Sequence, residues 1–253
     1  MKRPLLITCM AALTLGLAAC QATKPPSAEI PADPDDAVCE LRAAWQSAPG
    51  CTLYSGAPCE GGGETRSKAM IRRQAENLAF RHPDHIETRM LCGVLAYEAE
   101  DPVTAVHHLD HVLRIRPATP EAAVLRARIS LEQGNEQQAI RILEDQTTLR
   151  PDAYAVREAL ASAYFMNERH DEARSAIDAA ERLGAPSWRV AYNRGLLSEL
   201  DGEFGAASAH YESALADAPD WHLPRERLQG LDTVNAPPAM AMPEAGFPPP
   251  SEP

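Results

Sequence analysis

One stretch near the C-terminal end of the chain decides how the rest of the sequence is interpreted. Residues 200–219 read LDGEFGAASAHYESALADAP, with a turn signal at Asp201-Gly202, small residues throughout and a proline at the end. A helix is expected to begin after the glycine and to end before Pro219. Because its side chains are so small, a second helix can cross this one closely.

The same pattern recurs towards the N-terminus with a fixed period. Prolines at positions 83, 117, 151 and 219 are separated by 34, 34 and 68 residues, and Pro186 lies one residue late for the missing position. A fixed period of this length is typical of proteins built from stacked structural repeats. The period divides the chain into four units, which start at Ile86, Pro120, Tyr154 and Trp188.

Three places within each unit carry a constant type of side chain. The eighth place is small, the twentieth is alanine and the twenty-fourth is large and apolar; in unit order these are Gly93, Ala127, Ala161 and Gly195, then Ala105, Ala139, Ala173 and Ala207, then Leu109, Leu143, Ile177 and Tyr211. Glycine or alanine is needed where two antiparallel helices cross most closely. Between the two helices Asp101 precedes Pro102, which predicts a helix N-cap followed by proline in the first turn.

These places resemble the signature of the tetratricopeptide repeat, a 34-residue helix-turn-helix unit. The resemblance covers residues 86–221 and implies an all-α fold in which four repeats form a right-handed superhelix. The sequence departs from the family pattern at the seventh place, often leucine, where Arg126 and Arg194 stand. This departure affects packing details and leaves the register unchanged.

Both flanks of the repeats are also expected to contain helices. Residues 36–85 predict an N-terminal helical cap with a cysteine loop and a degenerate repeat, in which residues 37–45 pair with an apolar stripe from Met70 to Ala79. Residues 222–231 predict a helix that caps the last repeat. Residues 232–253 are rich in proline and lack periodicity, which predicts a disordered tail.

The N-terminus has the features of a bacterial lipoprotein signal. Basic residues precede a short apolar run that ends Leu17-Ala18-Ala19-Cys20, which resembles the lipobox. The resemblance implies a signal peptide at 1–19, acylation of Cys20 and a Pro-rich tether at 20–35; the alternative is an ordinary secretory signal cut after Ala19. Gln21 favours the periplasmic face of the outer membrane over the inner membrane, with the lipid chains as the only membrane attachment.

Four further cysteines fit an oxidising compartment. Cys39, Cys51, Cys59 and Cys92 are even in number and predict two disulfides with three possible pairings. The favoured pairing joins Cys51 to Cys59 across a turn-rich loop and Cys39 to Cys92. Zinc binding and free thiols remain alternatives, although no pair has the two-residue spacing typical of structural zinc.

The family resemblance also implies a concave groove formed by the first helix of each repeat, in which protein partners bind. Ten predicted groove residues are Met90, Val94, Tyr97, Arg128, Leu131, Glu158, Phe165, Met166, Tyr192 and Leu196. Six carboxylates and two arginines occur at groove positions around an apolar floor, which predicts a partner with apolar anchors and some positive charge. Phe165, Met166 and Tyr192 are the preferred anchors; packing between neighbouring repeats is the alternative role for each residue.

The sequence contains no recognisable catalytic motif. A net charge of −12 argues against nucleic-acid binding, and no phosphate-binding or hydrolase motif occurs. His107 and His111, four residues apart with Asp110 beside them, share a helix face and could together reach one metal ion. A solvent-facing helix surface is the preferred interpretation, so no enzyme activity, cofactor or metal is predicted.

The predicted function is therefore a non-enzymatic, lipid-anchored adaptor for protein assembly in the bacterial envelope. Lipoproteins of this build resemble the pilotins of type IV pilus secretins, by analogy at the level of the fold alone. Adaptors for outer-membrane protein insertion or for cell-wall hydrolases are alternatives, as is a subunit of a cell-wall or polysaccharide enzyme. Self-association into a homo-oligomer through the end helices is a further alternative.

Overall fold

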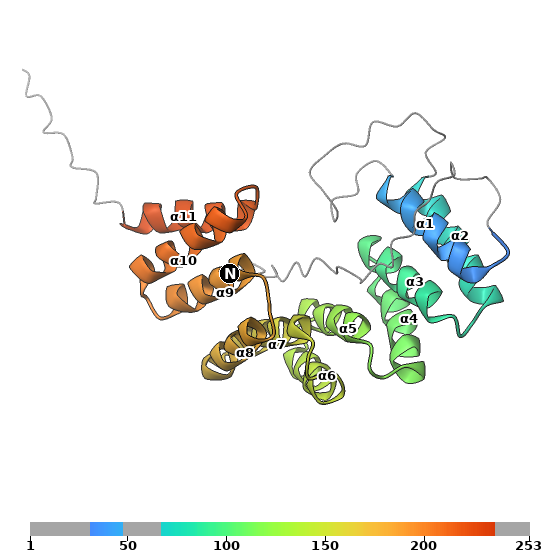
Figure 1. The fold of residues 1–253 in the computed structure, drawn as a ribbon, viewed down its shortest axis with the longest axis horizontal. Coiled ribbons are helices and arrows are strands. Elements are labelled where there is room, and N and C mark those ends of the chain that lie inside the picture. The colour runs from blue at the N-terminus through green and yellow to red at the C-terminus, as the bar shows by residue number, and fades with distance from the viewer. Residues whose placement is uncertain (1–30, 48–66, 236–253) are drawn as a thin grey trace, which may run out of the picture. The chain divides into compact units, whose positions relative to one another are not determined.

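The computed structural model describes residues 31–47 and 67–235, which contain eleven α-helices and no strand (Figure 1). The chain divides into two compact units, residues 1–186 and 187–253. The helices of the first unit are α1 (Pro34–Gln46), α2 (Lys68–Arg81), α3 (Ile86–Glu98), α4 (Pro102–Ile115), α5 (Pro120–Glu132), α6 (Glu136–Leu149), α7 (Tyr154–Met166) and α8 (His170–Arg182). Those of the second are α9 (Ser187–Leu200), α10 (Phe204–Asp217) and α11 (His222–Asn235). The all-α helix-turn-helix fold is thus confirmed.

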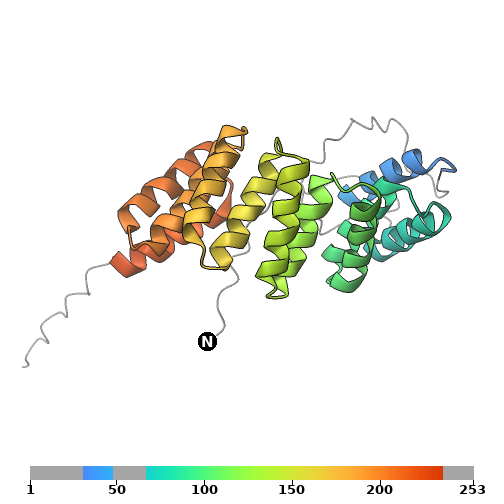
Figure 2. The same cartoon turned by 90° about the horizontal axis from the view of Figure 1, so that it is seen from below.

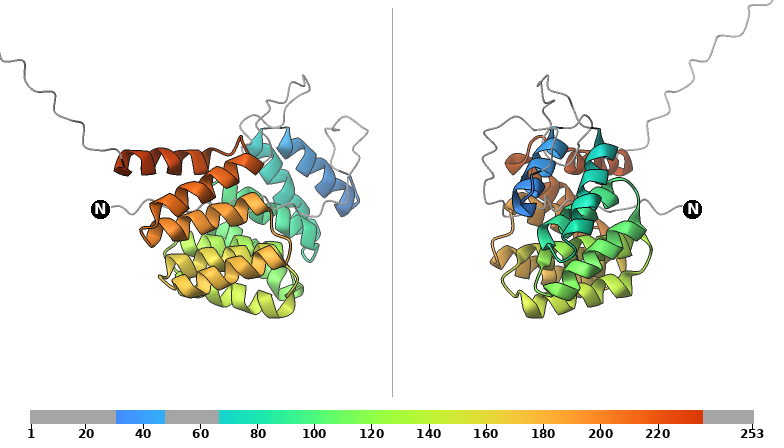
Figure 3. Two further views of the ribbon diagram at one scale, coloured as in Figure 1. Left: turned by 60° about the vertical axis from the view of Figure 1, so that its left-hand side comes forward. Right: turned by 90° about the vertical axis from the view of Figure 1, so that its right-hand side faces the viewer.

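The helices follow the period found in the sequence. The predicted unit starts Ile86, Pro120 and Tyr154 are the first residues of α3, α5 and α7, and α9 begins one residue before Trp188. Successive helices pair through short turns in both units (Figures 2 and 3). At the last helix the prediction was too short, because α11 continues to Asn235 and not to residue 231.

Close packing of a small residue against a large one joins the two helices of a pair. In the second unit, a Cβ atom added to Gly195 of α9 would lie 2.4 Å from Cε1 of Tyr211 in α10. In the first unit, a Cβ atom on Gly93 of α3 would lie 3.1 Å from the Leu109 side chain of α4. The eighth and twenty-fourth places of a repeat are therefore in direct contact, and at Gly195 there is no room for a side chain.

The turn between the two helices of each repeat requires a left-handed backbone conformation at one residue. Its φ is +72° at Gly134 and +77° at Gly202, and the equivalent residues Glu100 and Glu168 have φ of +57° and +62°. Glycine adopts this conformation without steric cost, whereas glutamate does not. The 34-residue register is therefore kept at the turn even where the favourable residue is absent. In the first of these turns Asp101 caps α4, accepting from Thr104 N at 3.1 Å, and Pro102 begins the helix as predicted.

The first unit starts with a core formed by helices that precede the repeats. Leu41 of α1, Ile71 and Leu78 of α2, and Leu95 of α3 are fully buried in one apolar cluster. Helices α1 and α2 thus supply the apolar partner that α3 needs on its N-terminal side, which is how a terminal unit completes a repeat array.

The core of the second unit is aromatic. Tyr192 of α9 packs against Tyr211 of α10 and against Trp221, with ring centroids 5.6 and 4.6 Å apart. Trp188 contacts the same Trp221 ring edge-on at 4.8 Å. Leu231 of α11 joins this cluster, so α11 covers the apolar side of the α9–α10 pair, the role predicted for a capping helix.

Substitution of Gly195 with alanine tests this packing. We expect Gly195→Ala to lower the free energy of unfolding by about 1–3 kcal/mol, because the new methyl group forces the Tyr211 ring to move. Gly205→Ala is the matched control: an added Cβ there has no atom within 4 Å, so the same change near the start of α10 should be neutral or stabilising by up to about 1 kcal/mol. Chemical denaturation followed by circular dichroism measures both. Equal effects of the two substitutions would show that the crossing is not tight.

Candidate functional site

The predicted binding residues of the first unit lie on α3, α5 and α7, the first helices of three successive pairs. Half-buried members of this set are Val94, Tyr97, Arg128, Phe165 and Met166. We call the surface that they form the first-helix surface. Because these side chains keep part of their area in solvent, they remain available to a partner.

Two of these residues are joined across neighbouring repeats. The guanidinium of Arg128 in α5 lies 5.3 Å from the ring centroid of Tyr97 in α3, within the range of a cation–π interaction. The Tyr97 hydroxyl donates to a Glu132 carboxylate oxygen, which also accepts from Arg128 Nε at 3.3 Å. Burial and the bond to Glu132 raise the pKa of Tyr97 to about 12. The phenol therefore stays protonated and remains a donor at neutral pH.

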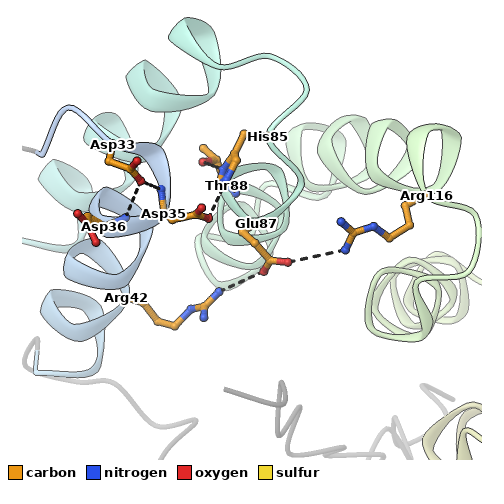
Figure 4. A network of polar contacts seen from close by, with 8 residues as sticks. All are labelled: Asp33, Asp35, Asp36, Arg42, His85, Glu87, Thr88 and Arg116. Atoms are coloured by element: carbon orange, nitrogen blue, oxygen red, sulfur yellow. Dashed lines mark hydrogen bonds and ion pairs between the residues drawn. The ribbon is translucent and has the colours of Figure 1, made fainter. Parts of the chain in front are cut away.

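Glu87 and Glu132, two of the six carboxylates at the predicted groove positions, are paired with arginines. Glu87 lies between two arginines, 3.8 Å from Arg42 of α1 and 4.0 Å from Arg116, which follows α4 (Figure 4). In the same network His85 Nε2 lies 3.0 Å from an Asp35 carboxylate oxygen (Figure 4). Since Glu132 is also paired with Arg128, the charge of two of the six groove carboxylates is neutralised within the molecule.

Four of the ten predicted groove residues are buried, which corrects the prediction that they face a partner. Met90 belongs to the apolar core between α3, α4 and α5, and Tyr192 belongs to the aromatic core of the second unit. Leu131 and Glu158 are 7 % and 1 % exposed. The physical reason is that the first helices also pack against neighbouring repeats, so an inward-facing position can serve the core instead of a partner. Packing, the alternative role, is what the structure shows for Met90 and Tyr192.

Phe165 and Met166 are the two preferred anchors that keep solvent exposure. They end α7, and the Phe165 ring contacts His170 of α8 edge-on, with centroids 6.0 Å apart. Leu196 of α9 in the second unit is also half-buried, packed at the edge of the aromatic core. The three residues remain candidates for partner contacts.

The predicted Cys39–Cys92 disulfide is wrong, because Cys92 is a free and fully buried thiol. It lies in the apolar cluster that α1, α2 and α3 form. Cys20, Cys51 and Cys59 lie outside the described residues, so the lipidation and the pairing of the loop cysteines stay predictions.

Instead, Cys92 belongs to a cluster that the sequence interpretation missed. One ligand atom each from Glu76 of α2, Cys92 of α3 and His108 of α4 lie within 4.8 Å of one another. His108 Nε2 is 3.1 Å from a Glu76 carboxylate oxygen, and its Nδ1 is 3.2 Å from Arg89 Nη1. The hydrogen bond from His108 is the main cause that lowers the pKa of Glu76, against the opposing effect of burial.

The histidines that the sequence singled out do not join this cluster. His107 is exposed, and His111 pairs with Asp84 at 3.2 Å. His108 is 3 % exposed, because one helical residue step turns the side chain by about 100° relative to His107. The repeat register could have indicated that Glu76 and Cys92 meet. The residues 34 places further on are Asp110 and Arg126, and these two form an ion pair at 2.9 Å.

The family model described as tetratricopeptide repeat matches residues 96–152 and 130–187. Residues 96–187 contain tetratricopeptide repeats. The family model and the 34-residue period thus agree that α4 through α8 belong to tetratricopeptide repeats.

Solved structures show the same fold at low sequence identity. A tetratricopeptide repeat protein from Parabacteroides merdae has a TM-score of 0.57 at 17 % identity, over 78 % of this chain and 77 % of that one. A thermophilic tetratricopeptide repeat protein of Thermus thermophilus has a TM-score of 0.57 at 15 % identity, over 65 % and 90 %. MamA from Desulfovibrio magneticus has a TM-score of 0.50 at 18 % identity, over 68 % and 89 %. No curated protein sequence is significantly similar to the chain.

The state of Cys92 can be measured directly. We expect its thiol to resist alkylation in the folded protein, because it is fully buried and burial raises its pKa to about 12. In denaturant without reductant, Cys92 should become labelled, as peptide mass spectrometry would show. A disulfide-linked peptide containing Cys92 in the unreduced digest would contradict the free thiol.

Proposed function

We propose that this tetratricopeptide repeat chain is a non-enzymatic, lipid-anchored scaffold that holds a partner protein on the periplasmic face of the outer membrane. The observation that carries the proposal is the first-helix surface, where apolar and aromatic side chains remain partly exposed on a repeat fold. Stacked repeats offer extended surfaces of this kind for protein binding.

The chemistry of the surface narrows the partner. Phe165 and Met166 offer adaptable apolar contacts at the end of α7, and aromatic and methionine side chains are enriched in protein interfaces. Arg128, one repeat away, and Tyr97, two repeats away, add a polar and aromatic contact. Since Glu87 and Glu132 are already paired with arginines, apolar anchors contribute more to the proposed binding than does positive charge on the partner.

The anchoring part of the proposal rests on the N-terminal sequence. The run ending Leu17-Ala18-Ala19-Cys20 supplies the acylation signal, and two or three acyl chains give a durable membrane attachment. Among residues 31–47 and 67–235, none of the helices combines the length and the apolar character that crossing a bilayer requires. The envelope assembly that we favour is the type IV pilus secretin.

The surface is tested with a double substitution and a matched control. We expect Phe165→Ala with Met166→Ala to weaken partner capture at least tenfold, because two apolar anchors are lost. Phe80→Ala is the control: it removes the same kind of side chain from α2, where Phe80 is 87 % exposed and lies at no predicted groove position. In-cell crosslinking of the tagged chain, followed by quantitative mass spectrometry, measures both variants.

The identity of the crosslinked protein distinguishes the assemblies. Recovery of a secretin supports the pilus role; recovery of an outer-membrane insertion complex or of murein hydrolases supports the alternative adaptors. Crosslinks to a polysaccharide-active enzyme favour a role as its subunit. Equal capture by the double variant and the wild type would rule out this surface, and crosslinks to other copies of the chain alone would indicate a homo-oligomer.

Lipidation is tested separately. We expect Cys20→Ser to move the chain from the membrane fraction to the soluble fraction, because no acyl chain is then attached. Cys9→Ser, within the predicted signal peptide, is the control and should leave the chain membrane-bound. Fractionation by density gradient, with immunodetection, also distinguishes the outer from the inner membrane. A membrane-bound Cys20→Ser chain would contradict the anchor.

A further inference from the structure

The cluster of Glu76, Cys92 and His108 has the composition of a metal site and lies outside the proposed partner surface. Its three ligand atoms come from three consecutive helices and lie within 4.8 Å of one another. Cys92 is fully buried, His108 is 3 % exposed and the Glu76 side chain is 36 % exposed. Three different metal-binding side chains therefore converge on one point inside the first unit.

We propose that Glu76, Cys92 and His108 bind one Zn²⁺ ion that links α2, α3 and α4. Thiolate sulfur, imidazole nitrogen and carboxylate oxygen are the three donor types that zinc accepts in proteins. Three protein ligands leave a fourth position for water, as in zinc sites that are not closed by a fourth side chain. The proposal does not depend on the partner-binding function.

The distances suit an ion of this size. Metal–ligand bonds of about 2.0–2.3 Å in a tetrahedron place the ligand atoms roughly 3.3–3.8 Å apart. His108 Nε2 and the nearer Glu76 oxygen are already 3.1 Å apart. Closing the remaining pairs, which are at most 4.8 Å apart, requires a movement of about 1 Å, well within side-chain rotation.

Arg89 orients the His108 ring in the metal-free protein. Arg89 contacts His108 Nδ1 at 3.2 Å and donates from Nε to the Pro83 carbonyl at 2.8 Å. This contact turns the other ring nitrogen, Nε2, towards Glu76. Because a guanidinium only donates, Nδ1 accepts from Arg89 and Nε2 carries the ring proton towards Glu76. For zinc to bind at Nε2, that proton moves to Nδ1 and the Arg89 guanidinium turns away from the ring. When the ion binds, the proton of the Cys92 thiol passes to solvent, as for other cysteine ligands.

Comparison with the next repeat indicates why a cation fits here. The places of Glu76 and Cys92 are taken 34 residues later by Asp110 and Arg126, which form an ion pair at 2.9 Å. There the arginine supplies a cation to the carboxylate. Between α2 and α3, Cys92 stands where that arginine stands in the next repeat. A zinc ion bound to Cys92 would supply the positive charge at the same place.

The cluster also has a route to solvent. A cavity of about 470 Å³ reaches Glu76 and is lined by residues of α1, α2 and α3, among them Trp45, Lys68, Leu95 and Glu98. Arg72 on the same wall is paired with Asp101. An ion can therefore enter past Glu76, the most exposed of the three ligands.

Cobalt titration of the purified full-length chain, first treated with chelator, tests the proposal. We expect one Co²⁺ per chain, with a near-ultraviolet thiolate-to-cobalt charge-transfer band that Zn²⁺ abolishes by competition. Cys92→Ser should remove this band, and Glu76→Gln and His108→Asn should weaken Co²⁺ binding at least tenfold. His107→Ala and His111→Ala are the matched controls and should bind as the wild type does.

The remaining outcomes also decide the question. No charge-transfer band, or a band that persists in Cys92→Ser, would overturn the proposal; persistence would assign the thiolate to another cysteine. Thermal unfolding followed by circular dichroism checks that each variant is folded. If Cys92→Ser does not fold, Glu76→Gln changes the most exposed ligand and keeps its shape: Zn²⁺ should raise the melting temperature of the wild type and not that of Glu76→Gln. An equal rise in both would also refute the site.

Discussion

The close crossing of the two helices within each repeat is the constraint on which the rest of the structure depends. At Gly195 the Tyr211 ring occupies the space that a side chain would need, and at Gly93 Leu109 does nearly the same. Because the crossing places one large residue against one small residue, it sets the separation of the pair and hence the position of every other side chain on both helices. The small and large residues therefore recur in the sequence with a period of 34.

This constraint leaves one set of helices to serve two purposes. The first helix of a repeat packs against the second helix of the same repeat and against the neighbouring repeat. Its remaining side is available to a binding partner. Met90 is used for the core, whereas Tyr97, Phe165 and Met166 keep part of their surface exposed. Tyr97 also joins Arg128 and Glu132 across the repeat boundary. The proposed interaction surface is thus continuous with the contacts that hold the repeats together.

The same register organises charge pairing between neighbouring helices. A carboxylate on one helix faces position seven of the following repeat, and the residue there decides how the charge is neutralised. Arg126 neutralises Asp110 directly, while Glu76 faces Cys92 and His108. Repeats of one architecture can therefore differ in chemistry at equivalent places, since the fold requires the contact and not the identity of the polar group.

The sequence by itself determined the repeat fold. Helix starts at Ile86, Pro120 and Tyr154, the cap at Asp101 and the small-against-large pairs follow from local patterns that recur along the chain. The sequence did not determine which inward-facing residues would be buried, because burial of Met90 or Tyr192 depends on neighbouring helices, far away in the chain. For the same reason, only the tertiary structure shows that Cys92 is a free thiol and that it lies beside Glu76 and His108. Spacing along one helix can be read from sequence, whereas the meeting of three helices is decided by how they pack.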